Sequence, residues 1–132
     1  MKQIFLSVFL VSAMLTSCKN ATKENNDKPG TEMASNDVET IHFGVRGNCT
    51  MCKATIEKAV NGVDGVEKAD WNVDNKEIEV SFNASKTNDM AIHKAIAGVG
   101  YDTDKMMADD AAYKDLPMCC QYDHEMKMSL SK

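Results

Sequence analysis

The sequence lacks the features expected of nucleic-acid binding or catalysis. It has 15 lysine and arginine residues against 20 aspartate and glutamate residues, a net charge of −5, and the basic residues form no cluster. Without a basic patch the chain has no surface suited to nucleic acid or anionic lipid headgroups. We find no general acid–base pair, activated hydroxyl or phosphate-binding loop, so we expect a protein that is not an enzyme.

The chain also lacks an apolar run long enough to span a membrane as a lasting helix. Its longest run, residues 4–15, is about a dozen residues, whereas a bilayer of roughly 30 Å needs about 20. Lys2 precedes this run, a pattern typical of an export signal over residues 1–17. The end of the run, Leu15-Thr16-Ser17-Cys18, resembles a bacterial lipobox. That resemblance implies cleavage before Cys18 and a lipid on its sulfur, whereas an ordinary secretory signal would leave the cysteine unexplained.

Residues 18–38 have almost no apolar content and are rich in Lys, Asn, Glu, Asp, Thr and Ser. This composition predicts a flexible linker between a lipid anchor at Cys18 and a folded domain. We therefore expect a cell-envelope protein, anchored to a bacterial membrane and facing the periplasm or the cell exterior. The remaining residues suffice for one small core. We divide them into a domain over residues 39–108 and a C-terminal extension over residues 109–132.

Hydrophobic periodicity within the domain predicts an α+β fold. Apolar residues alternate where we expect strands and recur every three or four residues where we expect helices. The expected order is strand, helix, strand, strand, helix and a short final strand, centred on residues 41–45, 52–63, 69–73, 78–82, 89–99 and 105–108.

An internal repeat supports this order. Residues 54–63 align with residues 90–99 at a constant offset, so the domain contains two similar βαβ halves. Two such halves assemble as a ferredoxin-like βαββαβ sandwich, a four-stranded antiparallel sheet with both helices on one face. The offset places Ser85 and Asn88 where the first half has Cys49 and Cys52, so only one half carries the cysteines.

Cys49 and Cys52 form a CxxC motif between an expected strand and an expected helix. A helix that starts at Cys52 would place its free N–H groups beside both sulfurs and favour thiolates. Thiolates select soft ions, Cu(I) first and also Hg(II), Cd(II) or Zn(II). Cu(I) is satisfied by two sulfurs, whereas zinc prefers four ligands. The motif alone also suits a disulfide or a redox pair, although no aromatic precedes Cys49 and no proline separates the two cysteines.

Cys119 and Cys120 form a second, adjacent pair in the extension. They could join the metal site, bind a second ion or form a vicinal disulfide. A four-cysteine zinc site ranks lower, because adjacent cysteines have poor geometry for one tetrahedral ion. Among the histidines, we expect His42 and His93 on solvated faces and His124 in a frayed terminus.

Residues 39–102 resemble the heavy-metal-associated domain of copper chaperones, metal-pumping ATPases and mercury-binding periplasmic proteins. The resemblance implies that Cys49 and Cys52 are the metal ligands and that Tyr101 packs near the metal loop. This family often has Met two residues before its first cysteine, but here that residue is Gly47, and Met51 lies between the cysteines instead. The tail Tyr113-Lys114-Asp115-Leu116-Pro117-Met118-Cys119-Cys120-Gln121-Tyr122 is similar to lipoprotein members of the family from Bacteroidetes-type bacteria.

The sequence therefore predicts a membrane-tethered protein that binds a soft metal ion through Cys49 and Cys52, for sequestration or delivery. Its expected partners are the ion, a metal efflux or transport protein, and a membrane at Cys18. Two alternatives stay open. One is a thiol–disulfide redox protein that uses Cys119 and Cys120 as a resolving pair. The other is a scavenger of Hg(II), Cd(II) or Zn(II) with the same fold.

Overall fold

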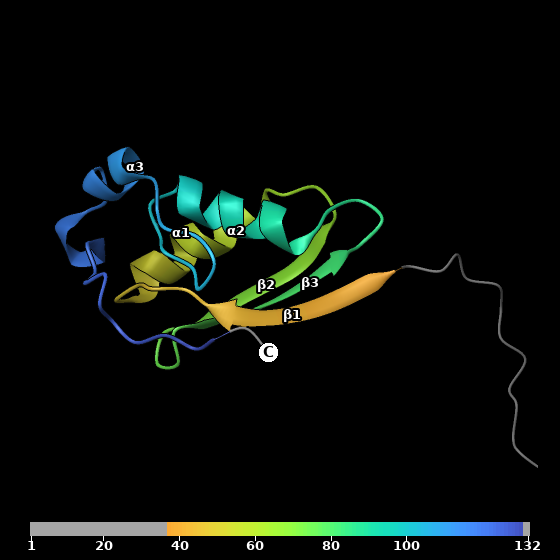
Figure 1. The fold of residues 1–132 in the computed structure, drawn as a ribbon, viewed down its shortest axis with the longest axis horizontal. Helices are drawn as coiled ribbons and strands as arrows, with labels where there is room; N and C mark the ends of the chain where they lie inside the picture. Colours follow the sequence, from red (N-terminus) through yellow and green to blue (C-terminus); the bar gives the residue numbers. More distant parts are fainter. Residues whose placement is uncertain (1–36, 131–132) are drawn as a thin grey trace, which may run out of the picture. The chain divides into compact units, whose positions relative to one another are not determined.

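The computed structural model describes residues 37–130, and Figure 1 shows their path from β1 to the C-terminal extension. The expected export signal, the lipid anchor at Cys18 and most of the expected linker lie outside the described residues. The elements are β1 (Val38–Gly44), α1 (Thr50–Asn61), β2 (Val66–Asn72), β3 (Glu77–Asn83), α2 (Asp89–Gly98), α3 (Asp110–Lys114) and a 3₁₀ turn (Met118–Cys120).

The three strands form one antiparallel sheet in the order β1-β3-β2. In the central strand β3, Ile78, Val80 and Phe82 are buried and the residues between them are partly exposed. This is the predicted alternation, because successive side chains of a strand point to opposite faces. The ferredoxin-like α+β fold is thus confirmed in its βαββα order.

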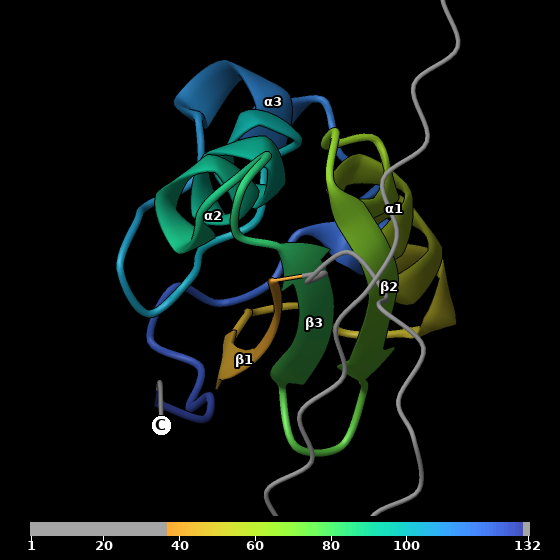
Figure 2. The same cartoon turned by 90° about the vertical axis from the view of Figure 1, so that its right-hand side faces the viewer.

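Both long helices cover the same face of the sheet, as Figures 1 and 2 show. Helix α1 buries Ile56 and Val60, and α2 buries Ile92 and Ile96, each pair four residues apart and so on one side of its helix. These residues belong to the apolar core that fills the space between helices and sheet. The apolar stripes predicted for the two helices are therefore the surfaces by which the helices pack on the sheet.

The prediction of a fourth strand over residues 105–108 is wrong. Among residues 37–130, pairing at the outer edge of β1 is limited to one isolated antiparallel bridge between Val45 and Thr103. The chain then turns, because the Met106 N–H donates to Thr103 Oγ1 at 2.9 Å and the Thr103 N–H donates to the Met106 oxygen at 2.8 Å. A threonine that closes a tight turn cannot also extend a strand.

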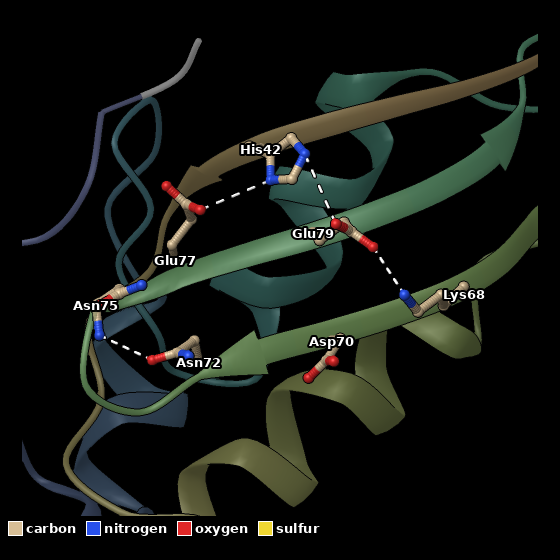
Figure 3. A pocket seen from close by; sticks show the side chains of 7 residues that line it. All are labelled: His42, Lys68, Asp70, Asn72, Asn75, Glu77 and Glu79. Carbon is tan, nitrogen blue, oxygen red and sulfur yellow. Dashed lines mark hydrogen bonds and ion pairs between the residues drawn. The ribbon is translucent and has the colours of Figure 1, made fainter.

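The other face of the sheet is open and polar. Figure 3 shows a shallow hollow on it, where His42 lies 3.6 Å from Glu77 and 3.8 Å from Glu79, and Lys68 contacts Glu79 at 2.7 Å. His42 is a partly exposed surface residue, as predicted. The lining of this hollow includes no cysteine.

The C-terminal extension has secondary structure of its own, because α3 and the 3₁₀ turn lie at the end of the domain where β1 leads into α1 (Figure 1). Leu116, Cys120 and Tyr122 of this segment are buried as members of the core. The extension is thus a packed part of the domain. Across the part of the chain that the structure describes, no helix is long and apolar enough to cross a membrane.

Candidate metal centre

The first cysteine of the CxxC motif lies directly before helix α1. The helix begins at Thr50, earlier than the predicted start at Cys52, and Cys49 is its N-cap residue with an extended backbone (φ −152°, ψ −177°). The backbone N–H groups of Cys52 and Met51, in the first turn, lower the pKa of the Cys49 thiol. The expected effect of a helix N-terminus on a thiol is therefore present at Cys49.

The second cysteine of the motif points inward. Cys52 has 0% of its surface exposed, and its Sγ accepts a hydrogen bond from the Asn48 N–H at 3.3 Å. The Sγ atoms of Cys49 and Cys52 are 3.9 Å apart, and both residues are free thiols. The motif thus offers one accessible sulfur and one shielded sulfur within reach of a single ion.

Gly47 provides the space that the loop needs beside Trp71. A Cβ on Gly47 would lie 3.0 Å from Trp71 Cη2 and 3.1 Å from Cys52 Cβ. Trp71 is fully buried, and its indole N–H donates to the Val45 oxygen at 3.1 Å. The indole ring therefore packs against the metal loop at Gly47, the position where the family resemblance leads one to expect methionine.

The 3₁₀ turn of the extension brings the second cysteine pair to the first. The Sγ atoms of Cys49, Cys119 and Cys120 all lie within 4.8 Å of one another. Cys119 Sγ is 3.9 Å from Cys120 Sγ and 3.8 Å from the Met51 sulfur. We call Cys49, Cys52, Cys119 and Cys120 the thiol cluster. The structure thus places the adjacent pair beside the CxxC loop.

The two thiols of the adjacent pair differ in environment. Cys119 is exposed, whereas Cys120 is 2% exposed. Burial, and then the neighbouring Cys52 thiol, raise the pKa of Cys120 to about 12. The cluster therefore combines an accessible outer edge, Cys49 and Cys119, with a protected inner edge, Cys52 and Cys120.

Tyr101 lies beside the inner edge of the cluster, as the family resemblance implied. It is fully buried, and burial, followed by the Cys52 and Cys120 thiols, raises the pKa of its hydroxyl. Among the described residues, its oxygen has no conventional hydrogen-bond partner. A buried hydroxyl without a partner is costly. The O–H group of Tyr101 is therefore a hydrogen-bond donor that is available to the two neighbouring sulfurs.

Asp102 anchors the extension to the loop before the cluster. Its side chain has 0% of its surface exposed, and its carboxylate lies 3.1 Å from Arg46 Nη1 and 2.7 Å from His124 Nδ1. It also accepts from the Ala108 N–H at 2.8 Å. Burial alone would raise the pKa of Asp102, but these three neighbours outweigh it and lower the pKa. No spacing or motif in the sequence signals this role.

Two histidine predictions are wrong. His124 is not in a frayed terminus, because it contacts Asp102 and packs on the rings of Tyr113 and Tyr122. His93 is not on a solvated face: it is fully buried, with Nδ1 2.8 Å from Thr103 Oγ1. The centre of its ring lies 3.9 Å from that of Phe43 in β1. Neither ring belongs to the thiol cluster.

Comparison with known proteins agrees with this geometry. A family profile described as "Heavy-metal-associated domain" matches residues 48–102. The copper chaperone CopZ of Staphylococcus aureus is 38% identical over 55 residues, which cover 42% of this chain and 81% of that protein. A copper-exporting P-type ATPase of Staphylococcus saprophyticus is 35% identical over 83 residues, 61% of this chain but 10% of the ATPase. The chain thus spans about a tenth of that ATPase.

Among solved structures, the N-terminal soluble domains of Bacillus subtilis CopA are 28% identical to this chain with a TM-score of 0.50. That match covers 52% of this chain and 48% of the CopA domains. The family match begins at Asn48 and ends at Asp102. Cys119 and Cys120 therefore lie beyond the part of the chain that the family profile describes.

Proposed function

The chain belongs to the heavy-metal-associated domain family, and we propose that it binds a soft metal ion, Cu(I), through Cys49 and Cys52. The observation that supports this most directly is the Sγ–Sγ distance of 3.9 Å between these two cysteines at the start of α1. One ion can bridge two thiolates at this separation. The role is that of a metal-binding protein rather than an enzyme.

Copper fits the chemistry of this end of the molecule. Thiolate and thioether sulfur select Cu(I) over hard cations, and Met51 adds a thioether 3.8 Å from Cys119 Sγ. Two relatives of this chain are named as a copper chaperone and a copper-exporting P-type ATPase. We infer Cu(I) in this chain from that likeness together with the sulfur ligands, and we rank Hg(II), Cd(II) and Zn(II) below it.

We further propose that the domain works at the end of a membrane tether. A lipid on Cys18 and the polar residues 18–38 would hold it near a bilayer outside the cytoplasm, where it sequesters copper or passes it to an efflux protein. A lipid contributes about 0.8 kcal/mol per buried CH₂, so a multiply acylated cysteine gives lasting attachment. The support for this step is the sequence of residues 1–38.

A competition titration tests metal binding. The reduced full chain with Cys18→Ser, kept in detergent because of residues 4–15, is titrated with Cu(I) against a chromophoric chelator. We expect tight binding of one Cu(I) per chain and its loss in a Cys49→Ser/Cys52→Ser variant. Parallel titrations with Zn(II) and Cd(II) test the choice of metal. Failure of the parent protein to compete, together with disulfide exchange with a reduced substrate, would favour the redox alternative.

A labelling experiment tests the tether separately. Cells that express the full chain are fed an alkyne-tagged fatty acid, and the protein is recovered and probed for the tag. We expect label on the wild type and none on Cys18→Ser. The Cys119→Ser/Cys120→Ser variant is the matched control, because it also removes thiols but should keep the label. Label on Cys18→Ser would refute attachment at this residue.

A further inference from the structure

The adjacent cysteines of the extension lie where additional ligands of the same ion would lie. With a metal–sulfur bond of about 2.3 Å, two thiolates in a linear site are about 4.6 Å apart, and three in a trigonal site are about 4.0 Å apart. The observed Sγ separations are 3.9 Å for Cys49 and Cys52 and 3.9 Å for Cys119 and Cys120. Both are closer to the trigonal value than to the linear one.

The thiols of the adjacent pair also face the right direction. Cys49, Cys119 and Cys120 have all three Sγ atoms within 4.8 Å of one another, so one ion placed among them needs only small side-chain rotations to bind all three. The 3₁₀ turn over Met118–Cys120 makes this arrangement. It removes the geometric objection to adjacent cysteines, because here both sulfurs point toward the CxxC loop.

Two further contacts suit a closed sulfur site. The Asn48 amide donates to the Cys119 oxygen at 3.2 Å and to the Gln121 oxygen at 3.4 Å, and so ties the CxxC loop to the extension. The Tyr101 hydroxyl, buried and without a conventional partner among the described residues, lies beside Cys52 and Cys120. A hydroxyl in that place can donate to a thiolate, which reduces the cost of burying its negative charge.

Building on the proposed function, we propose that Cys119 and Cys120 complete the metal site, so that Cu(I) is held by at least three thiolates and the extension closes over it. A two-coordinate ion on an open loop is readily attacked by a partner's thiolate. A third thiolate occupies the position on the ion that a partner's thiolate would attack. The Asn48 contacts hold the extension in place over the ion. The site is then built for retention, and release requires the extension to move.

X-ray absorption spectroscopy of the Cu(I)-loaded, reduced full chain with Cys18→Ser counts the sulfur ligands directly. We expect three or more sulfurs in this parent protein and two, with shorter Cu–S bonds, after Cys119→Ser/Cys120→Ser. The same variant should bind Cu(I) about tenfold more weakly or worse and transfer it faster to a chelator. The control is Met118→Ser, which changes a 90% exposed neighbour in the same turn and should leave all three readouts unchanged.

The outcomes separate this proposal from the proposed function. Two sulfurs in the parent, with unchanged affinity after Cys119→Ser/Cys120→Ser, would overturn the closed site but leave binding by Cys49 and Cys52 intact. No Cu(I) binding by the parent would overturn both. If the double variant unfolds in circular dichroism, Asn48→Ala replaces it. That variant keeps every thiol, so we expect the parent's sulfur count with faster transfer, and an unchanged transfer rate would contradict closure by the extension.

Discussion

The two long helices of the domain start in nearly the same backbone conformation but with different chemistry. Cys49 precedes α1 with φ −152° and ψ −177°, and Asn88 precedes α2 with φ −145° and ψ 169°. Asn88 accepts a hydrogen bond from the Ala91 N–H at 3.0 Å, the usual stabilising cap. Cys49 makes no side-chain cap bond. The first helix start therefore gives up a local stabilising contact for a thiol that can bind metal.

The loops that lead into the two helices differ in the same way. In the second loop the Lys86 and Thr87 N–H groups donate to the Asn83 oxygen at 3.0 and 3.1 Å, and Asp37, next to β1, accepts from the Ala84 N–H at 2.7 Å and lies 2.9 Å from Ser85 Oγ. The first loop is held by distant parts of the chain. The main-chain N–H of Arg46 donates to the main-chain oxygen of Asp102 at 2.9 Å, and the side-chain amide of Asn48 donates to the Cys119 oxygen in the extension. The helix start that carries the site is thus the one that depends on the extension.

The largest test of this contrast is Asp102→Ala. It leaves Arg46 and His124 without their buried partner, and breaking a buried charge pair costs about 3–5 kcal/mol. We expect a loss of that order in the free energy of unfolding by denaturant. Hydrogen exchange should show lost protection at residues 46–53 while residues 88–92 keep theirs. Asp70→Ala, at an exposed ion pair, is the control and should change stability little.

Acid should have the same effect as that substitution. Since the folded protein lowers the pKa of Asp102, its contribution to stability is present above the ordinary carboxyl pKa. It is lost as the pH falls through the lower, folded value. We expect the wild type to lose stability in this range more steeply than Asp102→Asn, measured by thermal unfolding at stepped pH. Parallel curves for the two proteins would contradict the assignment.

A smaller effect is expected from Gly47→Ala. The added methyl would meet Trp71 and Cys52, both fully buried, at 3.0 and 3.1 Å, and overpacking of this kind costs about 1–3 kcal/mol. Denaturant unfolding measures the loss. The matched control is Gly98→Ala in α2, where a Cβ meets nothing within 4 Å. There we expect no loss, and equal effects at the two glycines would show that the indole does not constrain the loop.

Exchanging the caps should reverse the contrast. Asn88→Ala removes the cap of α2 and should cost about 1 kcal/mol in the metal-free protein, without changing Cu(I) affinity. Cys49→Asn should stabilise the metal-free protein, because the backbone already has the geometry of a capped start, and should weaken Cu(I) binding. Thermal unfolding and competition titration give the two readouts. A destabilised Cys49→Asn would mean that the thiol itself supports the fold.

The smallest expected effect concerns the pKa of a thiol at the start of each helix. If the first turn of the helix lowers the pKa of Cys49, an Asn88→Cys thiol in the same backbone conformation should also titrate below an ordinary thiol. The ultraviolet absorbance of the thiolate, followed against pH in a chain with the other cysteines replaced by serine, measures it. An ordinary pKa at residue 88 would indicate that the neighbours of Cys49, rather than the helix end, set its pKa.

The elements with regular periodicity could be predicted from the sequence. Alternation marked β3, and the repeated stripe marked α1 and α2, because each pattern records which side chains face one core. The final strand could not be predicted in this way, because Thr103 ends the pairing with a side-chain bond that no apolar pattern reveals. His93 takes part in the same turn, because its buried ring has Nδ1 2.8 Å from Thr103 Oγ1.

The candidate site was predictable only where a motif carries it. The spacing of Cys49 and Cys52 pointed to a pair of metal ligands, and the likeness to a known family pointed to Tyr101. That Cys119 would meet Cys49 depends on a turn and on the burial of Asp102, contacts between residues far apart in the sequence. Such contacts depend on how the chain packs as a whole, so local patterns do not encode them.

The packing of Trp71 has an optical consequence. It is the single tryptophan of the chain, and its ring lies against the backbone of the loop that leads to Cys49, remote from solvent. The tryptophan fluorescence of the protein therefore comes from one defined environment, next to Gly47 in the loop before Cys49. We expect a rearrangement of this loop on metal binding to change the emission, so that Trp71 would report on the metal loading of the protein.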